Sequence, residues 1–196
     1  MELQSYSRPI AVELNFGIPP AFYGAKLGDF PEARKESIMR YLQELQPGLL
    51  FLTGPAGTGK THLAYAIFRN ERYNRKSPVF YIVSDLCEKI SRSGSFESDD
   101  RRFVERIRES KEILILDDLG AERLTDYVFQ GLYRILSYRE QWALPTVITS
   151  NLNLEEIAAK FSDRIASRIA SGKAIHFTGR DRRIREKKQQ WASKTN

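Results

Sequence analysis

A glycine-rich stretch that ends in lysine and threonine is the strongest chemical signal in this chain of 196 residues. Residues 54–61 read Gly-Pro-Ala-Gly-Thr-Gly-Lys-Thr and match the G-x-x-x-x-G-K-T pattern of a phosphate-binding loop. In such a loop the glycines let backbone N–H groups point at phosphate oxygens, the lysine reaches the β- and γ-phosphates, and the threonine hydroxyl binds Mg²⁺. The sequence therefore predicts a nucleoside triphosphate site with Lys60 as a catalytic residue and Thr61 as a metal ligand. The residues expected to contact the nucleotide are Gly54, Pro55, Ala56, Gly57, Thr58, Gly59, Lys60, Thr61 and His62.

The loop needs a strand before it and a helix after it, and the flanking residues predict both. Residues 49–52 are a short apolar run of the kind found in buried parallel strands. Residues 62–68 have a helical pattern, and the N-terminal dipole of that helix would face the bound anion. A glycine-rich turn that matches by chance is the alternative, and these two flanks argue against it.

Two adjacent acids follow another apolar run at residues 113–116. Open α/β sheets place their ligands at the C-terminal ends of strands, where Asp117 and Asp118 are expected to lie. Because side chains alternate in direction along a strand, we assign Asp117 to the Mg²⁺ shell through its water ligands. Asp118 is then expected to position or polarise the attacking water. The alternative is that both acids merely solvate the end of a strand.

An asparagine and two arginines complete the candidate chemistry. Asn151 ends the strand expected at residues 145–151, where its amide could orient the water or sense the γ-phosphate. A Thr-Ser-Asn turn is weak evidence alone, because serine and asparagine are common in turns. Arg164 and Arg168 lie four residues apart on one helix face. Arginine can neutralise charge on a transferring phosphoryl group, in the same subunit or from a neighbour, but surface ion pairs have the same spacing.

Short apolar runs alternate with helical patterns, which predicts an α/β fold with a parallel, doubly wound sheet. Ser84 and Asp85 are expected to cap a helix that ends near Ile90, and another helix is expected up to Lys111. The region between the second and third strands therefore carries an inserted helical element. Residues 1–30 are expected to form an extended lead-in with small local pieces. The expected strands are 49–52, 78–83, 113–116, 145–151 and 174–177.

Composition excludes several classes of protein. The hydrophobic fraction of 41% and the charged fraction of 29% are typical of a soluble globular domain. Cys87 is the only cysteine, which excludes a disulfide within the chain and a cysteine-rich zinc site. No apolar run approaches the ~20 residues of a membrane span, and the N-terminus lacks a signal-peptide core. We therefore expect a cytoplasmic location with no membrane partner.

The positive charge is concentrated at the C-terminal end. Residues 178–196 hold seven Lys/Arg and two Asp/Glu, so this tail carries +5 of the net charge of +6. A basic tail favours an anionic partner such as nucleic acid or nucleotide phosphate. A solvated chain end is the alternative reading.

Taken together, these motifs resemble the AAA+ domain of bacterial DnaC/DnaI-type helicase loaders and of the related IstB-like ATP-binding proteins. The resemblance extends from about Ile18 to Arg185, and it implies the AAA+ P-loop fold. That fold has a five-stranded parallel sheet between helices, here with little or no C-terminal lid. The motifs that carry the resemblance are residues 54–61, 116–124, 149–151, 167–169 and 181–183.

The resemblance also implies roles for individual residues. It implies a slow, Mg²⁺-dependent ATPase whose site lies between subunits of a nucleotide-dependent homo-oligomer, with ATP and Mg²⁺ as cofactors. By matching motifs, Asn151 would be sensor 1, and Arg168 would be the arginine finger, with Arg164 as its alternative. Arg183 would be sensor 2. Single-stranded DNA would meet the face of the inserted helix, where Phe96 and Tyr127 are candidates for stacking.

Several functions remain open at this point. The domains are expected at 1–17 (N-terminal extension), 18–178 (AAA+ ATPase domain) and 179–196 (basic tail with sensor 2). The leading hypothesis is a DNA-replication helicase loader that binds single-stranded DNA and a replicative helicase or another DNA-processing protein. The short extension argues against a helicase-gripping domain within this chain. The alternatives are an IstB-like transposition helper on duplex DNA, a P-loop small-molecule kinase and a nucleotide-gated scaffold. Asp118 replaces the glutamate of many hydrolytic sites, which puts strong turnover in doubt.

Overall fold

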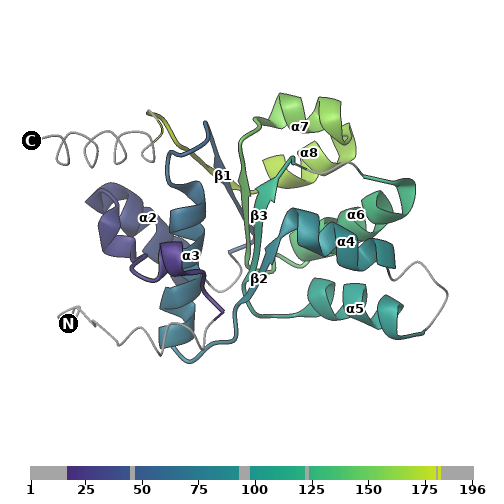
Figure 1. Ribbon diagram of the computed structural model, residues 1–196, viewed down its shortest axis with the longest axis horizontal. Coiled ribbons are helices and arrows are strands. Elements are labelled where there is room, and N and C mark those ends of the chain that lie inside the picture. Colours follow the sequence, from purple (N-terminus) through teal and green to yellow (C-terminus); the bar gives the residue numbers. More distant parts are fainter. Residues whose placement is uncertain (1–16, 45–46, 93–97, 122–123, 180, 182–196) are drawn as a thin grey trace, which may run out of the picture.

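Five parallel strands form the centre of the fold, and helices cover both faces of the sheet in the computed structural model (Figure 1). The structure describes residues 17–44, 47–92, 98–121, 124–179 and 181, with only the backbone described at 98–101. Within these residues the strand order is β2-β3-β4-β1-β5. The strands are β1 (Leu49–Thr53), β2 (Val79–Ile82), β3 (Leu114–Leu119), β4 (Thr146–Ser150) and β5 (Lys173–His176).

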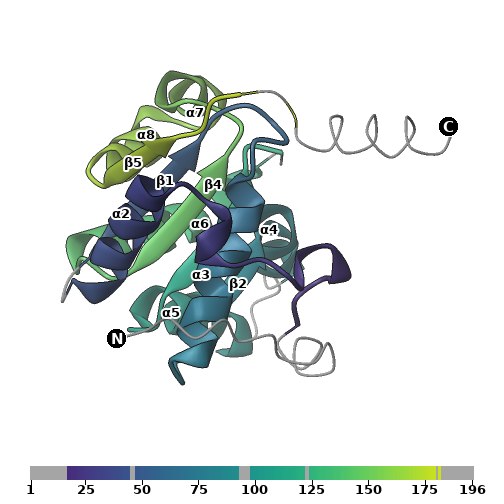
Figure 2. The same cartoon turned by 90° about the vertical axis from the view of Figure 1, so that its left-hand side faces the viewer.

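The helices form two layers that enclose separate hydrophobic cores (Figures 1 and 2). One layer contains α2 (Glu32–Gln43), α3 (Lys60–Tyr73) and the 3₁₀ helices η1 (Pro20–Phe22) and η2 (Leu27–Asp29). The other layer contains α4 (Val83–Arg92), α5 (Ser98–Glu109), α6 (Asp126–Gln141), α7 (Leu154–Lys160) and α8 (Asp163–Ala170). Helices on both faces of a parallel sheet are the arrangement that the alternating pattern predicts.

Strand β1 lies between β4 and β5, so both of its edges are paired. Its five residues are all buried, and their side chains alternate between the two cores. Leu50 and Leu52 enter the core under α2 and α3, whereas Phe51 enters the other core. A strand buried on both faces reads as a continuous apolar run, which explains the sequence of residues 49–52.

Gly54 connects β1 to the phosphate-binding loop through a contact that only glycine allows. Its φ is 135°, and a Cβ placed there would lie 2.1 Å from the carbonyl oxygen of Phe177. The N–H of Phe177 donates to the carbonyl of Thr53 at 2.7 Å. The end of β5 therefore holds the start of the loop at the C-terminal edge of the sheet.

A buried arginine links the chain at the N-terminal ends of β3 and β4, at the end of the sheet away from the loop. Arg139 of α6 is fully buried, and its guanidinium donates to four backbone carbonyls and one hydroxyl. Burial lowers its pKa to about 10, so the side chain remains charged at neutral pH. The network joins the end of α5 to the starts of β3 and β4. The acceptors are the carbonyls of Ile107, Ser110, Glu112 and Pro145 and the Oγ1 of Thr146, at 2.7–2.9 Å.

The predicted strands and the inserted helical element are confirmed, with two corrections. Ser84 and Asp85 do not cap a helix, because α4 already begins at the fully buried Val83 and continues to Arg92. The strand expected at 113–116 continues as β3 to Leu119 and includes both acids. Both errors arise where tertiary burial extends an element beyond its local pattern. Among the described residues, no helix has the length and apolar character needed to span a membrane.

Candidate nucleotide site

Lys60 occupies the centre of the phosphate-binding loop as the first residue of α3. The side chain is buried, and its Nζ donates to the carbonyls of Gly54 at 2.6 Å and Pro55 at 2.8 Å. A third bond runs from Nζ to the Oδ1 of Asn151 at 2.8 Å. The loop, the helix start and the end of β4 therefore converge on one ammonium group.

Asn151 links that lysine to the second acid. Its Nδ2 donates to Oδ1 of Asp118 at 3.0 Å, while its Oδ1 accepts from Lys60. The sequence predicted that Lys60, Asp118 and Asn151 share a site, and the structure joins Lys60 to Asp118 through Asn151. Such a chain of polar groups can transmit a change at the phosphate-binding lysine to the group that would hold the attacking water.

Asp117 faces the opposite direction, into the protein. It is 5% exposed, accepts a hydrogen bond from the Thr149 hydroxyl at 2.6 Å, and is also hydrogen-bonded to the Thr61 side chain. Burial raises the pKa of Asp117, and the bonds from Thr149 and Thr61 oppose that shift. A carboxylate beside the loop hydroxyl matches the oxygen ligands that Mg²⁺ prefers in phosphate sites.

The side chains of Asp117 and Asp118 have different partners because the backbone is irregular here. This corrects the expectation that regular strand alternation separates them. Asp118 has a φ of 62°, and the pairing of β3 with β4 shifts register between Leu116 and Leu119. The Asp118 N–H donates to Oγ1 of Thr149 at 2.9 Å, so one hydroxyl holds both acids. A positive φ at a non-glycine residue stores strain and often occurs at functional sites.

The chain beyond β5 returns to the loop at Gly57. Gly57 has a φ of 71°, and a Cβ there would lie 2.0 Å from Oδ1 of Asp181. The carboxyl of Asp181 therefore lies directly against the loop. Thr58 is buried and donates from its hydroxyl to the Pro55 carbonyl at 2.8 Å, which fixes the outer turn of the loop.

His62 faces the N-terminal layer of the fold. Its Nε2 lies 2.7 Å from Oδ2 of Asp29, and its ring centroid lies 5.8 Å from that of Phe30. The side chain therefore joins α3 to η2. Its predicted contact with nucleotide depends on the backbone at the start of α3.

Arg168 lies on the surface between α6 and α8, and its described contacts do not include the loop. Its Nη1 donates to Oε2 of Glu140 at 3.1 Å, and the guanidinium is hydrogen-bonded to the Tyr133 hydroxyl. These contacts raise the pKa of Arg168, and the hydrogen bond with Arg168 lowers the pKa of Tyr133. Arg164 lies one turn earlier on α8 and is exposed. Both arginines are therefore on a face that a neighbouring subunit could approach.

Three further residues were predicted to bind DNA or nucleotide. Tyr127 is 49% exposed near the start of α6. Phe96 and Arg183 lie outside the described residues.

Two residues of the site were missed. Thr149 holds both acids, and Asp181 contacts the loop. Thr149 stands two positions before Asn151 on the strand that pairs with β3, so its side chain could have been expected to face the acids. Nothing in the local sequence places Asp181 beside Gly57.

Comparison with known proteins identifies relatives among DNA-processing ATP-binding proteins. The replicative helicase loader DnaC of Escherichia coli K12 is 24% identical over 142 residues, which cover 69% of this chain and 56% of that protein. The insertion sequence IS5376 putative ATP-binding protein of Geobacillus stearothermophilus is 28% identical over 151 residues, covering 72% and 57%. This chain thus spans about half the length of these relatives.

Comparison with solved structures shows the fold. The crystal structure of the DnaC helicase loader superposes with a TM-score of 0.70 at 23% identity, covering 82% of this chain and all of that one. The fold is therefore that of AAA+ P-loop proteins. The sequence model of IstB-like ATP-binding proteins matches residues 40–179, a range that includes the loop, both acids, Asn151 and both arginines. The chain belongs to the IstB-like ATP-binding protein family.

Proposed function

We propose that this chain is a Mg²⁺-dependent ATPase that assembles through nucleotide and loads a replicative helicase onto single-stranded DNA. The observation that carries the ATPase is the continuous contact from Lys60 through Asn151 to Asp118, beside the Asp117–Thr61 pair. Charge neutralisation, metal ligands and a water-orienting acid are the parts that phosphoryl transfer to water requires. The similarity to a helicase loader supports the role in replication.

Each residue would act at its own place in that reaction. Lys60 would exchange its loop carbonyls for the β- and γ-phosphates, while Thr61 and Asp117 hold Mg²⁺ that neutralises phosphate charge. Asp118 would orient a water for in-line attack and accept its proton. Asn151, released by the lysine, would then bond the γ-phosphate or the water, as expected of sensor 1.

The arginines would contact the nucleotide from two places, a neighbouring subunit and the C-terminal tail of the same chain. Arg168 would reach the phosphate of a neighbouring subunit as arginine finger, with Arg164 as its alternative. The contact of Asp181 with Gly57 supports a role for Arg183 as sensor 2, because it brings the chain two residues earlier to the loop. These roles divide the chain into an extension (1–17), an ATPase domain (18–178) and a basic tail (179–196).

Assembly is the first property to measure. We expect light scattering to detect oligomers when Mg²⁺ and a non-hydrolysable ATP analogue are present, with larger or more stable species when single-stranded oligonucleotide is added. Arg168→Ala should lose these oligomers or their ATPase stimulation and still bind nucleotide, because its contacts lie away from the loop. Lys35→Ala, which removes the ion pair between a partly buried Lys35 and Glu32 on α2, is the control. A monomer under every condition would contradict both the assembly and the arginine finger.

Asp118→Asn should separate binding from hydrolysis. The amide keeps the size of the side chain but cannot accept a proton, so we expect turnover to fall about 100-fold while the ATP affinity changes little. Steady-state phosphate release and equilibrium nucleotide binding measure the two effects. ATP-bound oligomers should then accumulate. Unchanged assembly and partner release in this variant would instead favour a nucleotide-gated scaffold with negligible turnover.

A transposition helper is the second candidate, and the match to the IS5376 ATP-binding protein supports it. The two functions differ in the nucleic acid that each needs. Stimulation of the ATPase by duplex DNA above that by single strands would favour transposition, and the reverse preference would favour helicase loading. Phe96 and Tyr127 are the proposed stacking residues, so Tyr127→Ala should weaken the single-stranded complex selectively.

A further inference from the structure

A single hydroxyl on β4 contacts both acids of β3. Thr149 is 1% exposed, and its Oγ1 donates to Oδ1 of Asp117 at 2.6 Å and accepts from the N–H of Asp118 at 2.9 Å. A threonine hydroxyl has one proton to donate and lone pairs with which to accept. The two bonds use different parts of that capacity, so they do not compete with one another.

Asp117 and Asp118 form a β-bulge opposite Thr149. The pairing of β3 with β4 passes from Leu116 to Leu119 on one strand, while a single residue, Thr149, separates the partners on the other. A bulge of this kind sets two residues against one, disrupts the ladder locally and changes the direction of a side chain. The register shift between β3 and β4 is therefore a bulge of two acids opposite one threonine.

The bulge gives Asp118 a backbone conformation that other contacts must maintain. Its φ of 62° lies in the left-handed region, which is unfavourable for a residue with a Cβ. The extra residue of a bulge is left out of the ladder, yet a backbone N–H inside a protein usually has an acceptor. For Asp118 that acceptor is the Thr149 hydroxyl. A side chain thus supplies at the bulge what the backbone of β4 supplies along the regular ladder.

This conformation decides where the Asp118 carboxylate points. Its Oδ1 accepts from Nδ2 of Asn151 at 3.0 Å, and Oδ1 of Asn151 accepts from Lys60. Asp117 instead lies in the interior and is hydrogen-bonded to the Thr61 side chain. The bulge therefore separates the acid expected to hold the attacking water from the acid expected to hold the metal.

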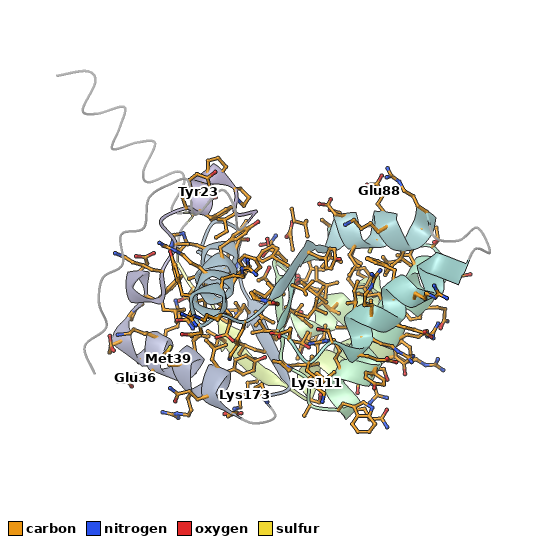
Figure 3. The ribbon with its side chains drawn as sticks, turned by 90° about the horizontal axis from the view of Figure 1, so that it is seen from below. Tyr23, Glu36, Met39, Glu88, Lys111 and Lys173 are labelled. Carbon is orange, nitrogen blue, oxygen red and sulfur yellow. The ribbon has the colours of Figure 1, made fainter. Side chains whose placement is uncertain are left out.

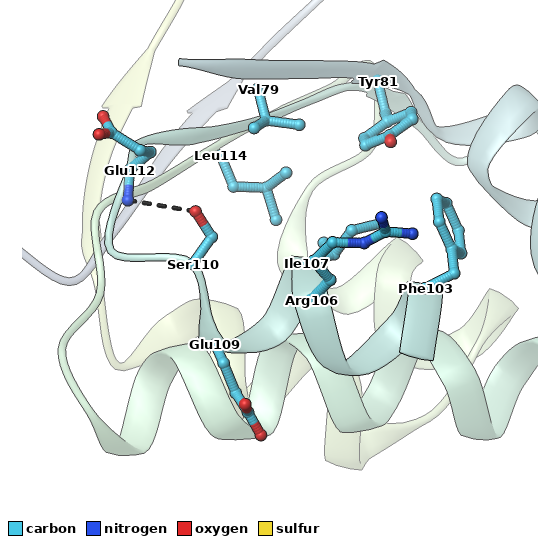
Figure 4. Close-up of a pocket in the computed structure, with 9 residues that line it drawn as sticks. All are labelled: Val79, Tyr81, Phe103, Arg106, Ile107, Glu109, Ser110, Glu112 and Leu114. Carbon is cyan, nitrogen blue, oxygen red and sulfur yellow. Dashed lines mark hydrogen bonds between the residues drawn. The ribbon is translucent and has the colours of Figure 1, made fainter. Parts of the chain in front are cut away.

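The other end of β3 is regular and provides an internal reference. The N–H of Leu114 donates to the Pro145 carbonyl at 2.9 Å. The Leu114 side chain lines a groove of about 690 Å³ together with side chains of β2 and α5 (Figure 4). Because this bond does not involve the Thr149 hydroxyl, the Leu114 amide reports whether the sheet itself is folded.

We propose that Thr149 is a positioning residue that holds the bulge and thereby aims the Asp118 carboxylate toward Asn151 and the attacking water. Its role in turnover rests on the proposed ATPase, whereas its hold on the backbone does not. Loss of the hydroxyl would release the Asp118 N–H and let that residue leave the left-handed conformation. The bond between Asp118 and Asn151 would then be lost, while the loop and Lys60 keep their places.

Hydrogen exchange of the Asp118 amide, measured without nucleotide, tests the hold on the backbone. Side chains lie between the sheet and the helices on both of its faces (Figure 3), so the substitution must keep the shape of the residue. Thr149→Val does so and removes the hydroxyl. In this variant the Asp118 amide should exchange at least about tenfold faster than in the unaltered chain, while the Leu114 amide changes little.

Two further variants separate the hydroxyl from a general effect on the sheet. Thr149→Ser keeps the hydroxyl and should keep the protection of the Asp118 amide. Thr53→Val removes another buried hydroxyl at the same end of the sheet, one that donates to the Leu152 carbonyl at 2.8 Å. It should leave the exchange of the Asp118 amide unchanged.

Turnover tests the consequence for the reaction. Thr149→Val should lower steady-state phosphate release about tenfold or more, because a misplaced reacting group is costly. The affinity for ATP should stay within about threefold, and Thr149→Ser should retain most of the turnover. Unchanged exchange of the Asp118 amide in Thr149→Val would overturn the proposal, as would full turnover in a variant that has lost the protection. Absence of turnover in the unaltered chain would contradict the ATPase instead, and the exchange rates would still decide whether Thr149 holds the bulge.

Discussion

Lys60→Ala is expected to weaken ATP binding by about 100-fold. Charge-assisted hydrogen bonds contribute about 1.5–3 kcal/mol each, and the lysine is placed to make them with the β- and γ-phosphates. Equilibrium titration with a fluorescent ATP analogue measures the loss.

The structure also provides a reason to check folding in this variant. Lys60 is buried and bonded to two loop carbonyls and Asn151, so its removal disturbs the empty loop as well as the bound one. Thermal unfolding without nucleotide separates the two effects. Lys35→Ala, which removes an ion pair away from the loop, is again the control. An affinity for ATP within threefold of that of the unaltered chain would contradict the assignment of the phosphate loop.

Arg139→Met should cause the largest loss of stability, about 4 kcal/mol in the free energy of unfolding. The methionine fills much of the volume but leaves four carbonyls without the buried donor that now serves them. That loss is a large part of the 5–15 kcal/mol typical of a domain. Urea denaturation followed by circular dichroism measures it.

Arg134→Met is the matched control, because it lies on the same helix with its side chain 49% exposed. Its ion pair with Glu105 is long, at 3.7 Å, so the expected change is below about 0.5 kcal/mol. Equal losses of unfolding free energy in the two variants would show that removing any positive charge from α6 lowers stability. The buried hydrogen bonds of Arg139 would then not be the cause.

The sequence predicted which side chains lie together at the ends of the strands. Parallel strands end at the same end of a sheet, so a loop after β1, acids in β3 and Asn151 after β4 were expected at that end. The order of the strands is not visible in any local pattern. The direct bonds from Asn151 to both Lys60 and Asp118 depend on that order and on rotamers, which only the packed sheet determines.

The features that sequence reasoning missed depend on tertiary contacts. Arg139 stands on the apolar face of its helix, in register with Leu132 and Leu136, but arginine is rarely buried and local periodicity cannot supply its acceptors. The left-handed φ of Asp118 breaks the alternation that was assumed for the two acids. The action of Arg168 on a neighbour's nucleotide stays a prediction.

The position of β1 has a consequence for how the protein is made. Leu49 pairs with Thr146 in β4, and Leu50 pairs with Lys173 in β5, so the strand before the phosphate loop lacks both neighbours when it leaves the ribosome. At a synthesis rate of roughly 5–20 residues per second, β4 follows β1 by roughly 5–20 s. During that interval the apolar residues 49–52 lack the two strands that pair with them in the finished fold. The candidate nucleotide site also needs Asn151, which follows β4, so it can form only after β4 has been made.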